Sequence, residues 1–221
     1  MNSLDSKIFI AQTYIGLAEK KGRKSVHIAW SGGKDSTVLL HIIYQMYGNK
    51  IPFAVDFGES RLEIPSHTSY IISISKLWKF NVHINSLLTK NDLKAFQTSR
   101  DKYFIKEALQ NSFEKILQRQ IIKENIKAIL WGTRIQDFGN NQDSFMIKKN
   151  GALYIYPLFH FTELDIWTYI YLHKIPINSI YEKGFRNSNI QPFLPKEITF
   201  QRIWFIFVRW YIKIRIKLRF I

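Results

Sequence analysis

Two adjacent glycines follow a short apolar run near the start of the sequence, in the stretch SVHIAWSGGKDSTVLLH that spans residues 25–41. Glycine adopts positive φ without steric cost and lets backbone N–H groups approach an anion closely, so we expect Gly32 and Gly33 to use both properties. The apolar segment that follows is typical of a helix, whose N-terminal N–H groups attract negative charge. The stretch therefore predicts an anion site, although the GxxxxGK[ST] spacing of the Walker loop is missing.

Other side chains of the same loop can complete this site. Hydroxyl groups donate to phosphate oxygens and an ammonium adds positive charge, whereas a carboxylate can only cap the helix or help to hold magnesium. The hydroxyl donors are Ser31, Ser36 and Thr37, the cation is Lys34 and the carboxylate is Asp35. These residue types indicate that the bound anion is a phosphate group.

The elements that must position this loop alternate between strand and helix patterns. Short apolar runs of strand length are separated by longer stretches with helical periodicity. Strands are expected at 26–30, 51–55, 80–84 and 128–131, and helices at 5–22, 35–47, 101–124 and 162–173, the last with Thr162 as N-cap. This alternation predicts an α/β fold with a Rossmann-like parallel sheet sandwiched by helices, in which ligands bind beyond the carboxyl ends of the strands.

The character of the chain changes near its C-terminus. We expect a nucleotide-binding domain over residues 1–194 and a basic, apolar tail over residues 195–221, whose segment KIRIKLRF at 213–220 alternates cation and apolar residue with the period of a strand. The longest near-apolar run, 203–212, has about half the length of a membrane-spanning helix and contains Arg209. The N-terminus has no continuous apolar segment of the secretory type, so a cytoplasmic protein without a membrane partner is predicted.

Charge and cysteine content restrict the function. The 221 residues include 32 Lys and Arg against 17 Asp and Glu, a net charge of +15, which attracts nucleotides, nucleic acid and acidic proteins. A lysine-rich composition with solvated surfaces gives the same balance, so charge by itself identifies no ligand. The chain has no cysteine, which excludes a thiol nucleophile and an iron–sulfur cluster bound by its own thiolates. No His, Asp and Glu cluster has the spacing of a metal site.

Several segments together resemble a known family. The SGGKDS motif at 31–36 resembles the PP-loop of the ATP pyrophosphatase superfamily, and AVDFGE at 54–59 is similar to its second-strand segment. The stretch YPLFHFTELDIWTYI at 156–170, followed by KIPI and YEKGF, resembles a segment shared by phosphoadenylylsulfate (PAPS) reductases and the small subunit of the ATP-dependent sulfate adenylyltransferase. The resemblance covers residues 20–190. It implies the adenine nucleotide alpha hydrolase-like fold and ATP as a substrate that is split between its α and β phosphates.

The resemblance also implies roles for single residues. The phosphate site would be lined by Ser31, Gly32, Gly33, Asp35 and Ser36. Asp56 would end the second strand, where its carboxylate either accepts a hydrogen bond from a ribose hydroxyl or is simply solvated. Gly58 would let the following loop turn close to the nucleotide.

A second loop of the resemblance supplies the expected catalytic charge. Gly132 and Arg134 match the family's G.R loop, in which the arginine contacts the anionic end of the substrate. A guanidinium presents a fixed fork of donors to phosphate or sulfate oxygens, so we expect Arg134, with Lys34, to stabilise charge in the transferred group. The alternative for Arg134 is an ordinary surface arginine.

The chain departs from its reductase relatives where their chemistry requires sulfur. Ile190 and Phe193 stand where the relatives carry cysteines, so reduction through a covalent sulfur intermediate is excluded for this chain acting alone. Ile135 replaces the second arginine of the sulfate-activating relatives, which weakens the indication for sulfate.

Three functions remain open. The first is an adenylyltransferase that activates a small oxyanion such as sulfate, with magnesium as an ATP companion and a GTPase-type partner subunit, as the resemblance implies. The second is ATP-dependent sulfur modification of nucleic acid, for which the net charge of +15 and the basic tail would be the footprint. The third is a nucleotide-binding relative without catalytic activity, or a PAPS reductase-like remnant that lacks the catalytic cysteine.

Overall fold

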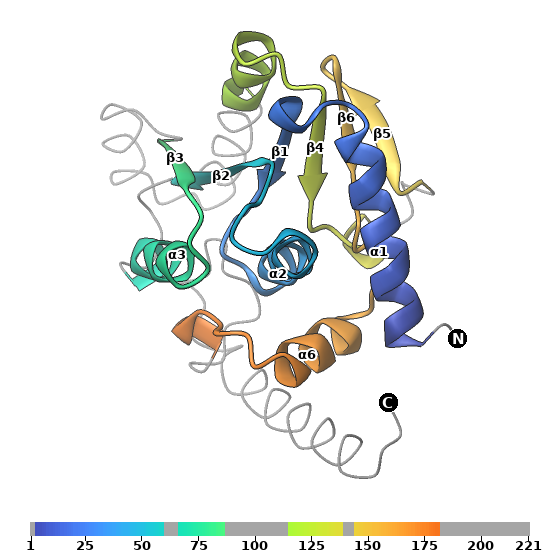
Figure 1. Cartoon of the computed structure of the whole chain (residues 1–221), viewed down its shortest axis with the longest axis vertical. Coiled ribbons are helices and arrows are strands. Elements are labelled where there is room, and N and C mark those ends of the chain that lie inside the picture. The colour runs from blue at the N-terminus through green and yellow to red at the C-terminus, as the bar shows by residue number, and fades with distance from the viewer. Residues whose placement is uncertain (1–2, 60–65, 87–114, 139–143, 182–221) are drawn as a thin grey trace, which may run out of the picture.

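Six strands form a single sheet in the order β3-β2-β1-β4-β6-β5 (Figure 1). The computed structural model describes residues 3–59, 66–86, 115–138 and 144–181. The strands are β1 (Val26–Ala29), β2 (Ala54–Glu59), β3 (Val82–Ser86), β4 (Ala128–Trp131), β5 (Met146–Lys149) and β6 (Ala152–Ile155). The helices are α1 (Leu4–Glu19), α2 (Lys34–Tyr47), α3 (Ser66–Leu77) and α6 (Glu163–Leu172), together with helical residues 115–123 and short 3-10 turns at Arg23–Ser25, Ile135–Asp137 and Ser179–Tyr181.

The central strands confirm the predicted parallel sheet. β1 pairs in parallel with both β2 and β4, and β2 and β4 continue in parallel to β3 and β6. The strand expected at 51–55 begins three residues later and extends to Glu59, because Pro52 cannot donate a ladder hydrogen bond. The tail from residue 195, with its predicted strand at 213–220, lies outside the described residues, as does most of the helix expected at 101–124.

One edge of the sheet is an antiparallel hairpin that the alternating pattern did not predict. β5 and β6 pair from Met146↔Ile155 to Lys149↔Ala152, which leaves Asn150 and Gly151 as a two-residue turn. Both turn residues have positive φ, at 54° and 85°. This is the geometry that Asn-Gly favours between two strands, so the pair was the available sequence signal for the hairpin.

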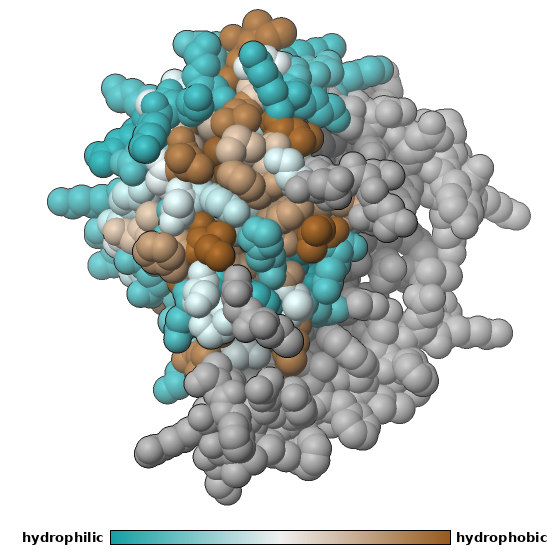
Figure 2. Space-filling view, turned by 90° about the vertical axis from the view of Figure 1, so that its right-hand side faces the viewer, coloured by the Kyte–Doolittle hydropathy of each residue, from teal (hydrophilic) through white to brown (hydrophobic). Residues whose placement is uncertain are grey.

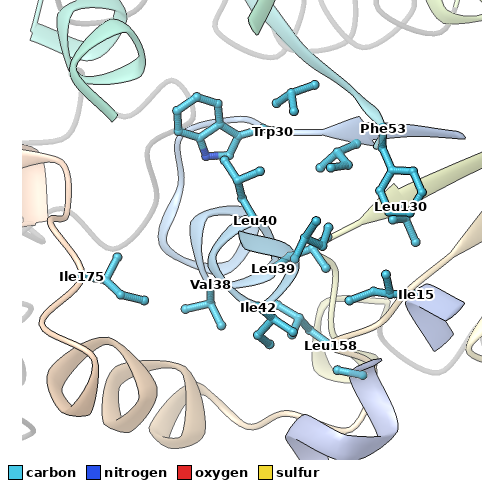
Figure 3. Close-up of a cluster of buried hydrophobic side chains, with 14 of the residues drawn as sticks. Ile15, Trp30, Val38, Leu39, Leu40, Ile42, Phe53, Leu130, Leu158 and Ile175 are labelled. Carbon is cyan, nitrogen blue, oxygen red and sulfur yellow. The ribbon is translucent and has the colours of Figure 1, made fainter. Parts of the chain in front are cut away.

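Helices α1, α2 and α3 cover one face of the sheet, α6 packs on the outer side of α2, and the four helices bury the larger core (Figure 1). In the close-up of this core, apolar side chains of α2 point outward in several directions (Figure 3). They meet Ile15 of α1, Trp30 just after β1, Leu130 of β4, Leu158 before α6 and Ile175 after α6. Because α2 is packed on so many sides, the loop that precedes it is held in a fixed position.

A smaller core lies on the opposite face, where β4 and β6 meet the helical residues 115–123. Its buried members are Ile121, Ile126, Ile129, Ala152, Tyr154, Tyr156 and Phe159. The sheet is therefore enclosed by helices on both faces, as predicted.

The N-terminus of α6 confirms the predicted cap. The Thr162 hydroxyl accepts from the Asp165 backbone N–H at 3.2 Å, and the Asp165 carboxylate accepts from the Thr162 backbone N–H at 2.6 Å. The same carboxylate lies 2.5 Å from Lys7 Nζ of α1, so the cap also joins α1 and α6.

The outer surface on the α1 side mixes brown hydrophobic side chains with teal hydrophilic ones (Figure 2). Phe9 of α1 is 70% exposed, whereas Ala11 and Ile15 of the same helix are fully buried. Within the described residues, no helix combines the length and the apolar character that crossing a membrane requires.

A buried histidine makes the fold sensitive to acid. His41 of α2 lies 3.0 Å from the Tyr169 hydroxyl of α6, and its ring is tilted against the rings of His173 and Trp78. Burial, and secondarily the neighbouring His173, lowers the pKa of His41 from 6.5 to about 4. The unfolded chain therefore takes up a proton near pH 6.5 that the folded chain refuses until about pH 4.

We expect the free energy of unfolding to be highest above pH 6.5. It should fall by on the order of 2–3 kcal/mol as the pH drops from 6.5 through 4. Urea unfolding at intervals across this range measures it. His41→Asn, which cannot titrate but keeps an oxygen acceptor for Tyr169, should show a flatter pH profile. Equal slopes for the two proteins would remove His41 as the cause.

Candidate functional site

The glycine loop lies beyond the carboxyl end of β1 and leads directly into α2. Gly32 has φ +70°, the left-handed conformation that favours glycine, and a Cβ there would lie 2.6 Å from Ile71 Cδ1 and 3.0 Å from His67 Cε1. Gly33 has φ −73° and serves as N-cap of α2 without a side-chain bond. The prediction of positive φ is therefore confirmed for Gly32 and wrong for Gly33, whose backbone conformation any residue can adopt.

Two serines hold the loop closed. Ser31 Oγ lies 3.0 Å from Ser36 Oγ, the Ser36 hydroxyl donates to the Gly33 carbonyl at 3.2 Å, and the Ser31 backbone N–H donates to Ser36 Oγ at 3.2 Å. The Gly33 N–H in turn donates to Ser31 Oγ at 3.3 Å. The structure thus brings both predicted hydroxyls together at the start of α2, where rotation of the hydroxyls can turn them toward an anion.

The loop presents backbone donors that the protein does not use. Within the described part of the chain, the N–H groups of Gly32, Asp35 and Ser36 have no hydrogen-bond acceptor. The neighbouring Lys34 N–H is taken by the Tyr181 hydroxyl at 2.8 Å. α2 is 14 residues long, so its positive end adds to these donors. Together they can bind one phosphate group without any change in the backbone.

Gly132 brings the end of β4 against the first turn of α2. A Cβ on Gly132 would lie 2.8 Å from Ser36 Cα and 2.9 Å from Ser36 N, atoms of the backbone that cannot move aside cheaply. The absent side chain therefore leaves the Ser36 N–H uncovered. The structure brings Gly132 to the predicted site, and it does so for a steric reason.

The charged residues of the loop pair with one another. Lys34 is 2% exposed, and its Nζ lies 2.9 Å from Asp35 Oδ2 and 3.8 Å from Glu163 Oε1. Asp35 Oδ1 lies 2.9 Å from Arg134 Nε. Asp35 Oδ2 thus faces Lys34 and Oδ1 faces Arg134, while the N-cap of α2 is Gly33, so Asp35 does not cap the helix and its part in holding magnesium stays a prediction. The Lys34 ammonium points into this pair and away from solvent.

Arg134 is buried instead of lying on the surface, with 5% of its area exposed. Its Nη2 donates to Asp137 Oδ1 at 3.0 Å, and its backbone N–H donates to Asp137 Oδ2 at 2.9 Å. Nη1 is enclosed and has no acceptor among the described residues. Arg134 thus links β4 to the loop through its ion pair with Asp35, and neither Nε nor Nη1 makes a hydrogen bond to a described residue.

Three predicted site residues lie elsewhere. Thr37 is 1% exposed, and its hydroxyl accepts from Trp30 Nε1 at 3.1 Å, so it packs inside the core. Asp56 does not end β2 but lies within it, with its carboxylate 2.5 Å from His27 Nδ1 and 3.4 Å from His83 Nδ1. Gly58 is also a strand residue, paired with Asn85, so the turn expected there is wrong.

Two residues that carried no predicted role contact the loop directly, and a third contacts it through one of them. His67 of α3 lies 2.8 Å from the Ser31 carbonyl, Asn178 lies 2.7 Å from His67, and Tyr181 accepts from Lys34. Tyr181 belongs to the YEKGF segment of the resemblance, which was the only signal for it. Nothing in the sequence marked His67, because a lone histidine at a helix start has many uses. Among the described residues, no group of three or more His, Asp or Glu could hold a metal ion.

Most of the sequence matches a known protein family. Residues 25–188 match the phosphoadenosine phosphosulfate reductase domain. The sulfate adenylyltransferase subunit 2 of Shewanella loihica is 26% identical over 176 residues, which cover 69% of this chain and 58% of that protein. The chain therefore spans less than two thirds of that relative.

Two solved structures share the fold. The phosphate complex of PAPS reductase from Candida auris superposes with a TM-score of 0.64 at 14% identity, over 80% of this chain and 85% of that one. The FMN adenylyltransferase of Candida glabrata, in complex with FMN and the ATP analogue AMPCPP, gives a TM-score of 0.60 at 21% identity, over 87% and 65%. Because the family match extends over residues 25–188, the chain belongs to the phosphoadenosine phosphosulfate reductase domain family.

Proposed function

We propose that the chain binds the phosphates of ATP at residues 31–36 and uses ATP to adenylylate a small oxyanion, with sulfate as the first candidate. The observation that carries this proposal is the set of three backbone donors, at Gly32, Asp35 and Ser36, that have no acceptor among the described residues. Similarity to a sulfate adenylyltransferase subunit supports both ATP and sulfate as substrates.

The reaction fits the groups that the chain provides. A sulfate oxygen attacks the α-phosphorus of ATP, the bond from that phosphorus to the bridging oxygen breaks, and pyrophosphate leaves with the electron pair while adenylyl sulfate forms. Negative charge grows on the departing pyrophosphate, where backbone N–H donors and a guanidinium stabilise it. No thiolate is needed, in keeping with a sequence that has no cysteine.

Among the charged residues, Arg134 fits a catalytic role better than Lys34. Arg134 contacts Asp35 of the loop through Nε at 2.9 Å, and its Nη1 has no acceptor among the described residues, so we assign Nη1 to a phosphate bound at the loop. Lys34 is held at 2.9 Å by Asp35, and we assign it to positioning that carboxylate. Magnesium would enter with the ATP phosphates as part of the substrate.

A partner subunit is part of the proposal. The relative from Shewanella loihica is named as a subunit of its enzyme, and this chain spans only 58% of it. We therefore expect ATP binding by the chain itself, and full turnover after a second subunit is added.

The proposal is tested in two steps with the full chain. Calorimetric titration with ATP and magnesium measures binding first, with GTP as the control nucleotide. Release of pyrophosphate from ATP is then followed with and without sulfate, and adenylyl sulfate is identified by mass spectrometry. Failure to bind ATP at millimolar concentration would reject the nucleotide site, and sulfate-independent release would reject sulfate as the acceptor.

A second candidate function rests on the net charge of +15. A chain that modifies nucleic acid would bind RNA with an affinity that falls log-linearly with salt concentration. Adding tRNA to the same pyrophosphate assay separates the two functions, because only the true acceptor should accelerate the release.

A further inference from the structure

The segment after α6 reaches back to the glycine loop and contacts it through buried polar groups. We call residues 175–181 the strap. Ile175, Asn178 and Tyr181 of the strap are 5%, 1% and 2% exposed. The Tyr70 hydroxyl of α3 donates to the Pro176 carbonyl at 2.8 Å, which fixes the start of the strap on α3. The strap therefore lies between α3 and the N-terminus of α2.

His67 connects the strap to the loop. Asn178 Nδ2 donates to His67 Nδ1 at 2.7 Å, so Nδ1 must carry the lone pair. His67 Nε2 then carries the hydrogen and donates to the Ser31 carbonyl at 2.8 Å. A carbonyl can only accept, so both contacts agree on one neutral tautomer. At 2% exposure, the imidazole has little freedom to exchange these partners for water.

The His67 bond decides where the Gly32 N–H points. In a trans peptide, C=O and N–H point in opposite directions. Since the Ser31 carbonyl is directed at His67 on α3, the Gly32 N–H of the same peptide is directed away from α3. This N–H is one of the three donors without an acceptor among the described residues. The close approach of His67 also requires Gly32 to lack a Cβ, which would lie 3.0 Å from the ring.

Tyr181 acts on a different donor of the loop, the Lys34 N–H. Its hydroxyl accepts from the Lys34 N–H at 2.8 Å and so removes that group from the anion site. The N–H groups on either side of this bond, at Gly32, Asp35 and Ser36, are left for a ligand. The strap thus determines which of the successive donors are presented and how the first is oriented.

We propose that His67 and Asn178 are positioning residues, which set the orientation of the Gly32 N–H and thereby the affinity of the loop for the phosphates of a nucleotide. This inference rests on the proposed binding of ATP at residues 31–36. Neither residue touches the nucleotide in this role; both act through the Ser31–Gly32 peptide.

Two variants of His67 separate its two hydrogen bonds. The amide nitrogen of His67→Gln can replace Nε2 and donate to the Ser31 carbonyl, while the amide oxygen of His67→Asn can replace Nδ1 and accept from Asn178. Both variants remove the imidazole ring and lose a similar amount of packing. We expect ATP affinity to fall on the order of tenfold in His67→Asn and less than about threefold in His67→Gln.

Two further measurements distinguish positioning from folding. Thermal unfolding should show similar destabilisation of the two variants, so a difference in affinity cannot come from stability. Hydrogen exchange without nucleotide should be faster across residues 31–34 in His67→Asn than in His67→Gln. Equal affinity losses that follow the loss of melting temperature would overturn the inference. If the wild type binds no ATP, the proposed function fails as well; if it binds and His67→Asn binds equally, only the positioning role fails.

Discussion

Replacing Gly132 with alanine is expected to weaken ATP binding on the order of 100-fold, because it covers a donor whose hydrogen bond to a charged phosphate contributes about 1.5–3 kcal/mol. The new Cβ would lie 2.9 Å from Ser36 N and 2.8 Å from Ser36 Cα. Relief of this contact must displace either β4 or the first turn of α2, at a cost of about 1–3 kcal/mol in the free energy of unfolding. Calorimetric titration and urea unfolding measure the two effects.

Gly16→Ala is the matched control for this change. A Cβ at Gly16 meets no atom within 4 Å, and the residue lies inside α1. Alanine there should leave ATP affinity unchanged and stabilise the helix by about 0.5–1 kcal/mol. ATP affinity of Gly132→Ala equal to that of Gly16→Ala would show that the end of β4 is not part of the phosphate site.

Arg134→Lys is expected to lower both turnover and stability while leaving the net charge unchanged. A single ammonium cannot replace Nε, which faces Asp35 at 2.9 Å, and Nη2, which donates to Asp137 at 3.0 Å. One of the two carboxylates therefore loses a guanidinium contact, while Asp35 keeps Lys34 and Asp137 keeps the Arg134 backbone N–H, so we expect a cost of roughly 1–2 kcal/mol. If Nη1 also contacts the transferred group, the rate of pyrophosphate release should fall by a larger factor than ATP affinity.

Arg23→Lys controls for the loss of a guanidinium as such. Arg23 pairs with Glu19 at 2.6 Å, but its side chain is 65% exposed. Surface pairs of this kind contribute little, so we expect a change within about 0.5 kcal/mol and unaltered ATP binding. Pyrophosphate release by Arg134→Lys at the wild-type rate would leave Arg134 with a structural role alone.

The fold was predictable because its signals are local. Apolar runs and helical periodicity identified the central strands and most helices, and the Thr162 cap followed from the residue types at the start of α6. β5 and β6 were missed although Asn150-Gly151 is a strong turn signal and the apolar run ALYIY at 152–156 follows it directly. Boundaries shifted at β2, where Pro52 delays the pairing.

The site was predictable only in its backbone. The sequence predicted the loop, and the resemblance pointed to Gly132. Both involve glycine because another group approaches the main chain closely at these positions. The sequence could not show that Lys34 and Asp35 pair with each other, because side-chain direction depends on Glu163 and Arg134, which are distant in sequence. The same limit applies to Thr37. Its residue type predicted a hydroxyl donor to the ligand, whereas in the structure this hydroxyl accepts a hydrogen bond from Trp30 Nε1.

The position of β1 between β2 and β4 also bears on how the chain folds. Ala29 of β1 pairs with Asp56 of β2, a short separation, whereas Val26 pairs with Ala128 of β4. The second pairing closes a loop of about 100 residues, and such non-local contacts form late and slow the folding rate. During synthesis, β1, α2 and β2 would emerge well before β4, so the unpaired edge of β1 is the stretch most exposed to aggregation and to chaperone capture.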